Sequence, residues 1–305
     1  MSQVLPDVLD YNVIMDKAVS DKIKQDLINT GVFLESDTYQ LFKNWKNQRV
    51  FDTYREHSYS YSKGSANVDG TIDVLAETGI QDNNMVLFLP IECKKADPRL
   101  KHWVFEPHRP TTPKQQELIM SVKNGNCFYN RWYNFPGLGY NAYSDYENCV
   151  NVFEFNETDG RLSRQGQKEL RAYYAIKQAN ESVPGVVDKI PALSRNSSYH
   201  NVIVPIVVTT ANLWVTDYDP AEISKENGDI PIDKLELKPK NWVIYSYPVP
   251  FHESISGTLQ DNKGDEGSIT PDKRLTFIVK STSLKEFVES LIGDLRDYFN
   301  PPDGE

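Results

Sequence analysis

The chain has 305 residues, of which 39% are hydrophobic, and a formal net charge of −10 at neutral pH. This length suffices for one large domain or two small ones. The acidic balance argues against a nucleic-acid partner unless positive charge is concentrated locally. No apolar run approaches the length of a membrane span, so we expect no membrane partner. The first residues lack the basic and apolar regions of a signal peptide, and we expect none.

The cysteines and histidines exclude several common kinds of site. Cys93, Cys127 and Cys149 form no C-x-x-C pair, which favours a reduced, cytoplasmic location over a zinc site or a disulfide framework. The five histidines form no HxH or HExxH motif. Neither G-x-S-x-G nor a P-loop sequence occurs in the chain.

The chain opens with two predicted helices and a predicted strand. Apolar residues among charged ones predict an amphipathic helix over residues 14–30, which Gly31 ends. A second helix is predicted over residues 35–45, with Glu35 in its first turn. There Glu35 either favours the helix dipole or supplies a carboxylate to a metal site. Alternating tyrosines predict a strand within residues 51–61.

Residues 68–95 form the stretch around which the chain is organised. Two apolar runs flank the turn-rich residues 78–84, which predicts a strand, a turn and a strand. The second run is almost wholly apolar, as in a central strand buried on both faces. Asp73 interrupts the first run, whereas Glu92 and Lys94 end the second and point to the same face. Two carboxylates beside a lysine suit a hard divalent cation and the water that it activates. The alternative is a surface hairpin with a solvated Glu–Lys pair.

At these residues the sequence resembles the PD-(D/E)xK nuclease superfamily, which has the restriction-endonuclease-like fold. Thr30-Gly-Val-Phe-Leu-Glu35 resembles the start of the first core helix in one bacterial branch, and Glu92-Cys-Lys-Lys95 followed by Trp103-Val-Phe resembles its E-C-K-K…W-V-F stretch. The resemblance covers about residues 20–125, and more faintly 202–218. The chain departs from it in the long gap before Trp103 and in lacking a proline before Asp73.

The resemblance implies a fold and a set of roles. The fold class would be α/β, with a restriction-endonuclease-like central mixed sheet flanked by helices and a C-terminal α+β elaboration. Asp73, Glu92 and the backbone carbonyl of Cys93 would hold Mg²⁺, with Mn²⁺ as a substitute. Lys94 would orient the attacking water, and Glu35 would be a third acid at the metal.

The residues after Lys94 carry local positive charge and aromatic side chains. Residues 94–114 contain six Lys and Arg against two Asp and Glu, as a groove that follows phosphates would need, although ordinary surface scatter gives the same excess. Lys95 and Arg99 are candidates for contacting substrate. A helix is predicted from Pro113 over residues 114–122, where Gln115 and Gln116 are either substrate-binding or surface residues. Residues 126–149 are an aromatic insertion, which either stacks bases or forms a minor core.

The remaining elements suggest an α/β sheet with an acidic C-terminal third. A strand is predicted over residues 150–155, a helix over 163–179 and a loop over 180–198. Residues 202–208, which 213–215 extend, predict another buried strand or hairpin that pairs with the strand over 85–91. Residues 242–249 and 275–280 suggest strands, 256–271 a mobile loop, and 284–299 an amphipathic helix. Residues 216–305 contain 10 Lys and Arg against 18 Asp and Glu.

We therefore expect a single nuclease-like domain over residues 1–305. Its catalytic core would comprise about 14–125 and 150–218, with an acidic elaboration over 219–305. The leading hypothesis is a Mg²⁺-dependent phosphodiesterase, an endonuclease acting on DNA; a homo-oligomer is compatible with this. One alternative is a nuclease-fold module that binds nucleic acid or a protein and cuts nothing. Another is a metal-dependent enzyme acting on a small phosphorylated molecule.

Overall fold

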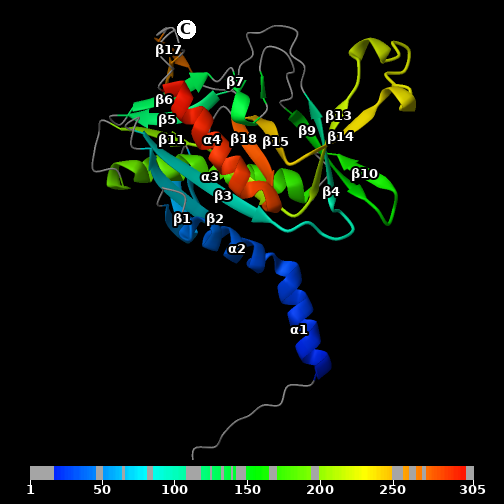
Figure 1. The fold of residues 1–305 in the computed structure, drawn as a ribbon, viewed down its shortest axis with the longest axis horizontal. Helices are drawn as coiled ribbons and strands as arrows, with labels where there is room; N and C mark the ends of the chain where they lie inside the picture. The colour runs from blue at the N-terminus through cyan, green and yellow to red at the C-terminus, as the bar shows by residue number, and fades with distance from the viewer. Residues whose placement is uncertain are drawn as a thin grey trace, which may run out of the picture.

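The computed structural model describes most of the chain, in fourteen segments. They are residues 17–45, 51–63, 66–80, 85–107, 118–123, 126–131, 134–138, 140–141, 149–164, 170–193, 199–248, 257–260, 266–269 and 273–299. Within them the chain forms a mixed α/β structure, with four α-helices and one large mixed sheet of sixteen strands (Figure 1).

The helices are α1 (Lys17–Thr30), α2 (Val32–Lys43), α3 (Arg171–Leu193) and α4 (Leu284–Phe299). The first strands are β1 (Asp52–Lys63), β2 (Ala66–Ile80), β3 (Met85–Lys94), β4 (His102–Pro107), β5 (Leu118–Lys123) and β6 (Asn126–Arg131). The next are β9 (Cys149–Asn156), β10 (Arg161–Arg164), β11 (His200–Ile203), β12 (Ile206–Thr209) and β13 (Asn212–Asp217). The last are β14 (Glu236–Lys240), β15 (Trp242–Pro248), β16 (Gly257–Gln260), β17 (Glu266–Ile269) and β18 (Lys273–Lys280); β7 (Asn134–Phe135) and β8 (Tyr140–Asn141) pair separately.

Strand β3 lies at the centre of the core and pairs on both edges. On one edge it pairs with β2 in an antiparallel hairpin, from Ile80 opposite Met85 to Val74 opposite Ile91. On the other edge, β11 and β12 pair in parallel with its first and second halves. Because both faces of β3 are covered, its residues from Leu87 to Cys93 are all buried, which explains the continuous apolar run in the sequence.

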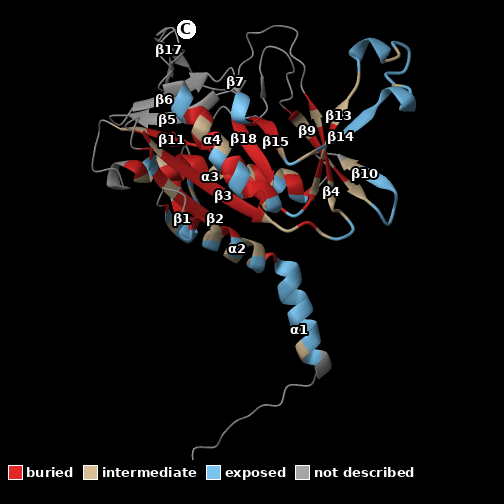
Figure 2. Ribbon diagram, in the orientation of Figure 1, coloured by how far each residue is buried: buried red, intermediate tan, exposed pale blue. Residues whose placement is uncertain are grey.

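Helices cover both faces of this central sheet. Phe42 of α2 and Phe287 of α4 belong to a core cluster that also contains Leu89 and Ile91 of β3. On the opposite face, Val183 of α3 packs with Phe88 in a separate cluster. Figure 2 shows the buried strands between these helices. Since side chains alternate along β3, Glu92 and Lys94 fall on the face that α3 covers.

Helix α1 differs from the other three because it extends away from the body (Figures 1 and 2). Its apolar side chains Val19, Ile23, Leu27 and Ile28 are each at least 43% exposed. Only its C-terminal end reaches the core, where the Lys95 ammonium donates to the Ile28 carbonyl. No helix in the described ranges is long and apolar enough to cross a membrane.

Several predicted elements are confirmed. The hairpin over residues 68–95 is β2 and β3, and the strand within 51–61 is β1. The C-terminal helix over 284–299 has the predicted bounds. The strands predicted at 150–155, 242–249 and 275–280 correspond to β9, β15 and β18.

Other predictions are wrong. Residues 118–122 of the predicted helix 114–122 lie in strand β5, which pairs with β6 and β11. The helix predicted over 163–179 begins only at Arg171 and runs through the predicted loop to Leu193. Its apolar partners on β1, β2 and β3 outweigh the helix-breaking Pro184-Gly185. Residues 202–208 contribute to two successive strands, β11 and β12, which both pair in parallel with β3; the predicted pairing is confirmed, but the two strands form no hairpin with each other. Strands β16 and β17 occupy part of the predicted loop 256–271.

Candidate functional site

The hairpin brings Asp73 and Glu92 together at the end of the β2–β3 pairing. Val74 of β2 is paired with Ile91 of β3 at one end of their ladder, so Asp73, which precedes Val74, and Glu92, which follows Ile91, lie just beyond the last pair. The Cys93 backbone N–H donates a hydrogen bond of 2.7 Å to Oδ2 of Asp73. This bond replaces the next bond of the ladder and fixes the Asp73 carboxylate beside Glu92.

Burial of these two acids changes their protonation. Glu92 is only 5% exposed. Burial, and then the neighbouring Asp73 carboxylate, raise the pKa of Glu92 to about 8. Burial also raises the pKa of Asp73 to about 6, against the opposing hydrogen bond from Cys93. The pair therefore binds protons at neutral pH unless a cation lies between the carboxylates.

Glu35 approaches this pair from helix α2. The helix begins after Gly31, whose φ of +90° is a conformation that side-chain-bearing residues rarely adopt. Glu35 follows in the first turn and lies 3.8 Å from the Arg55 guanidinium of β1. Its negative charge contributes to raising the pKa of both Asp73 and Glu92. Glu35 is therefore a third carboxylate near the pair, with its own cationic neighbour.

One pocket of about 330 Å³ contains the predicted acids and the lysine. We call it the acid pocket; it is lined by Asn29, Thr30, Glu35, Asp73, Glu92, Cys93, Lys94, Lys95, Arg171, Tyr174 and Gln178. The Lys94 ammonium lies 5.9 Å from the centre of the Tyr174 ring, so the aromatic face helps to place this charge. The hairpin, α2 and α3 thus all contribute to one concave site.

Helix α3 supplies three side chains that sequence reasoning did not assign to the site. Arg171, Tyr174 and Gln178 follow an i, i+3, i+7 spacing, which places them on one face of the helix. This spacing is the signal that could have found them, and Tyr174 is 54% exposed although it is aromatic. The Oε1 atom of Gln178 is buried and has no hydrogen-bond partner in the described part of the chain. A buried acceptor without a partner is the kind of atom that a bound water or ligand satisfies.

Strand β1 is irregular where it passes this site. Its register with β2 runs from Arg55 opposite Val74 to His57 opposite Ile72 and omits the pair between them, Glu56 and Asp73. Glu56 has a φ of +49°, which is strained for a residue with a side chain. Such strain is frequent near functional sites.

The remaining predicted site residues differ in position. Lys95 lines the acid pocket, and its ammonium is bound to the Ile28 carbonyl. Arg99 lies on the loop after β3 and pairs with Asp97, outside the acid pocket. Gln115 and Gln116 lie outside the described residues. Burial raises the pKa of the Cys93 thiol well above its usual value, so its sulfur is no nucleophile.

The donors in the acid pocket fit a small divalent cation better than a transition metal. No cluster of three His, Cys, Asp or Glu side chains close enough to enclose a metal is found among the residues described. Mg²⁺ does not require such a cluster, because it keeps several waters and binds one or two carboxylates together with substrate phosphate. Asp73 and Glu92 could supply two such carboxylates, and burial, which raises the pKa of both, disfavours their charged forms unless a cation or a proton offsets the charge.

Comparison of the chain with protein-family models, with curated proteins and with solved structures found no match.

Proposed function

We propose that the chain is a metal-dependent phosphodiesterase that hydrolyses nucleic acid, with DNA as the expected substrate and endonucleolytic cutting as the expected mode. The observation that carries the proposal is that Asp73, Glu92 and Lys94 line one pocket, where the partly buried Asp73 and the buried Glu92 both have raised pKa values. The resemblance of these residues to the PD-(D/E)xK superfamily, and a mixed α/β core, support the same reading.

The residues of the acid pocket have complementary roles in this mechanism. Asp73 and Glu92, with the Cys93 carbonyl, would hold Mg²⁺ or Mn²⁺, which would activate a water and offset charge on the pentavalent transition state. Lys94, placed by Tyr174, orients the attacking water and stabilises negative charge as it develops near the phosphate. Glu35 accepts a proton or holds a water at the edge of the pocket. Gln178 offers its buried Oε1 as an acceptor for the same water.

A cleavage assay tests the proposal. Wild-type protein and Asp73→Ala would be incubated with supercoiled plasmid and with single-stranded DNA, in Mg²⁺, Mn²⁺ or EDTA. Asp69→Ala is a matched control, because Asp69 also lies on β2 but not in the acid pocket. We expect metal-dependent cutting by the wild type and the control, and none by Asp73→Ala. Equal cutting by Asp73→Ala would contradict the proposal.

A second candidate function is a binding module with the same fold that cuts nothing. The acidic surface of residues 216–305 favours this reading, because a protein partner needs no basic groove. Tight DNA binding without cleavage in any metal would establish it. The complete set of two acids and a lysine argues against it, since a binding module has no chemical use for a buried acid pair.

A further inference from the structure

A second pocket lies beside the acid pocket and carries a net excess of cationic side chains, whereas acids and cations balance in the acid pocket. Its volume is about 450 Å³, and we call it the cationic pocket; it is lined by Gln25, Asn29, Lys95, Ala96, Asp97, Pro98, Arg99 and Arg171. Asn29, Lys95 and Arg171 line both pockets, so the two are contiguous. Three cations and two amides line the cationic pocket against a single acid, Asp97.

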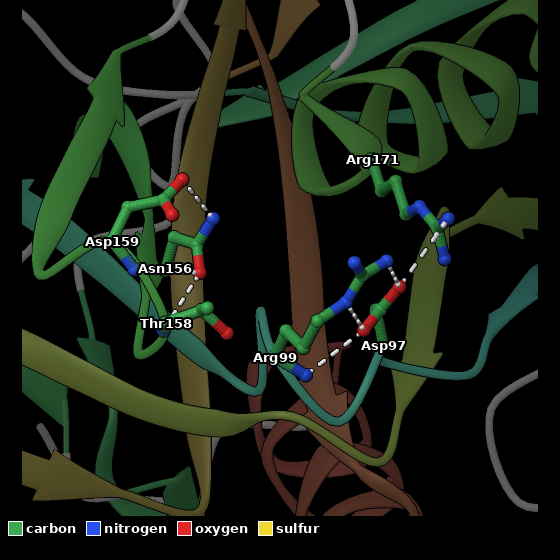
Figure 3. A network of polar contacts seen from close by, with 6 residues as sticks. All are labelled: Asp97, Arg99, Asn156, Thr158, Asp159 and Arg171. Atoms are coloured by element: carbon green, nitrogen blue, oxygen red, sulfur yellow. Dashed lines mark hydrogen bonds and ion pairs between the residues drawn. The ribbon is translucent and has the colours of Figure 1, made fainter.

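Asp97 lies between the two arginines of this pocket (Figure 3). Its Oδ2 atom is 3.2 Å from Arg99 and 3.7 Å from Arg171. Its Oδ1 atom accepts hydrogen bonds from the Arg99 backbone N–H at 2.9 Å and from Nε at 3.2 Å. A carboxylate held by two guanidinium groups has contacts that a phosphodiester could make in the same place, because each group presents two anionic oxygens that accept hydrogen bonds from guanidinium N–H donors.

The arginines remain accessible to a ligand from solvent. The side chain of Arg99 is 71% exposed and that of Arg171 is 49% exposed, whereas Asp97 is 13% exposed beneath them. Ion pairs with such exposed partners contribute little free energy, so an incoming anion can replace the carboxylate at small cost.

Arg171 is held in position by the start of α3. The helix begins at Arg171, and the Ala172 backbone N–H donates a 2.6 Å hydrogen bond to Oε1 of Glu154 on β9. Glu154 is 1% exposed, so this contact is fixed within the core. The guanidinium therefore projects from a rigid helix end toward both pockets.

We propose that the cationic pocket binds the phosphodiester group next to the scissile one, and that Asp97 occupies this phosphate position until a strand displaces it. The inference depends on the proposed function, and it specifies the substrate as a strand with at least two consecutive phosphates. A mononucleotide would fill the acid pocket alone. Because Asp97 pairs with Arg99 and Arg171, it competes with a ligand phosphate for them and weakens the binding of short or singly phosphorylated ligands.

A binding experiment without cleavage tests this inference. Fluorescence anisotropy of a labelled single-stranded DNA oligonucleotide would be measured in EDTA over a range of salt concentrations. The variants are Arg171→Ala and Asp97→Asn, since asparagine keeps the Oδ1 acceptor for Arg99 and removes the charge. The controls are Arg161→Ala, an exposed arginine on β10, and Glu222→Gln, which loses an exposed pair with Lys234 far along the chain. Cleavage by wild type and Asp73→Ala is measured in parallel.

We expect Arg171→Ala to reduce the slope of log affinity against log salt by about 0.7, the loss of one phosphate contact on a single strand. Asp97→Asn should tighten binding about two- to fivefold, because it removes the competing ion pair. If Arg171→Ala matches Arg161→Ala, or Asp97→Asn matches Glu222→Gln, the inference is overturned, and metal-dependent cutting by the wild type would leave the nuclease proposal standing. If both effects appear but nothing is cut, the cationic pocket stands as a strand-binding site and the nuclease proposal fails.

Discussion

The acid pocket and the cationic pocket share three lining residues but shift the pKa of their carboxyl groups in opposite directions. In the acid pocket, burial and mutual repulsion raise the pKa of Asp73 to about 6 and of Glu92 to about 8. In the cationic pocket, hydrogen bonds from Arg99 hold the pKa of Asp97 below its usual value. The acid pocket thus disfavours the charged form of its carboxylates, whereas the cationic pocket favours it.

This difference follows from where each carboxylate lies in the fold. Glu92 is buried near the end of β3 and Asp73 is partly buried within β2, so solvent stabilises their charge poorly. Asp97 lies on the loop beyond β3, where guanidinium groups and solvent reach it. Under the proposed function, a nucleic-acid strand that lies across both pockets would contact the cation held by Asp73 and Glu92 and then the arginines of the cationic pocket.

The largest effect is expected for the lysine of the acid pocket. Lys94→Ala should reduce metal-dependent cleavage at least about 100-fold, because it removes the charge that stabilises the developing negative charge. The fold should persist, since Lys94 is partly exposed at the strand end. Lys177→Ala is the control, because Lys177 lies on α3 and pairs with Glu181 outside the pocket. Initial rates measure cleavage, and circular dichroism measures whether the variant is folded. A loss of cleavage rate below tenfold would contradict a role for Lys94 in the mechanism.

The second effect is on stability, and its sign follows from the raised pKa of Glu92. Between pH 4.5, near its unfolded value, and about 8, the folded state binds more protons than the unfolded state. The free energy of unfolding of the metal-free protein therefore falls as pH rises through this window. Glu92→Gln removes this loss and should stabilise the metal-free protein at pH 8 by roughly 1–3 kcal/mol.

Denaturant unfolding at pH 5 and at pH 8 measures this effect. The gain from Glu92→Gln should be small at pH 5 and larger at pH 8. Glu289→Gln, an exposed acid on α4, should show no such difference. Equal gains at the two pH values would show that Glu92 is not held as a buried acid.

The third effect is expected at Glu154, which holds the start of α3 and thereby the position of Arg171. Glu154→Ala leaves the buried Ala172 N–H without its acceptor and should destabilise the fold by about 1–3 kcal/mol. It should also weaken strand binding, because Arg171 would lose its fixed position. Glu154→Gln keeps the Oε1 acceptor and should restore both properties. Binding that stays at the wild-type level in a folded Glu154→Ala protein would contradict a positioning role.

The smallest effect is expected at Gln178. Its buried Oε1 has no partner in the described ranges and lines the acid pocket, so Gln178→Ala should weaken Mn²⁺ binding about tenfold through the loss of an outer contact. Gln40→Ala on the exposed face of α2 is the control. Isothermal titration calorimetry measures the affinity of both variants for Mn²⁺. An unchanged affinity in Gln178→Ala would show that Gln178 only packs in the fold and does not contribute to cation binding.

The part of the site carried by the hairpin could be predicted from the sequence, because strand alternation and the apolar run of residues 85–91 are local signals. They place Asp73, Glu92 and Lys94 together, and the structure brings them into one pocket. Gly31 likewise marks the start of α2 and so the position of Glu35.

The contribution of α3 could not be predicted in the same way. The start of the helix depends on a hydrogen bond from the Ala172 N–H to Glu154 of β9. The helix continues through Pro184-Gly185 because it packs on the sheet. Gly185 lies so close to Tyr59 of β1 that an added Cβ would be 2.5 Å from a Tyr59 carbon. Such long-range contacts outweigh local propensity and leave little trace in a single sequence. Long-range contacts also explain why residues 118–122 form a strand instead of the predicted helix, because they pair with β6 and β11.

The measurement that tests the central claim most directly is a calorimetric titration of Mn²⁺ into the wild-type protein and Asp73→Ala. It would be made at pH 7 in two buffers of different ionisation enthalpy, so that protons released on binding are counted. Because Glu92 is mostly protonated at this pH, we predict binding that releases close to one proton in the wild type and is lost in Asp73→Ala. Absence of binding by the wild type, or equal binding by Asp73→Ala, would contradict the assignment of the acid pocket as a cation site.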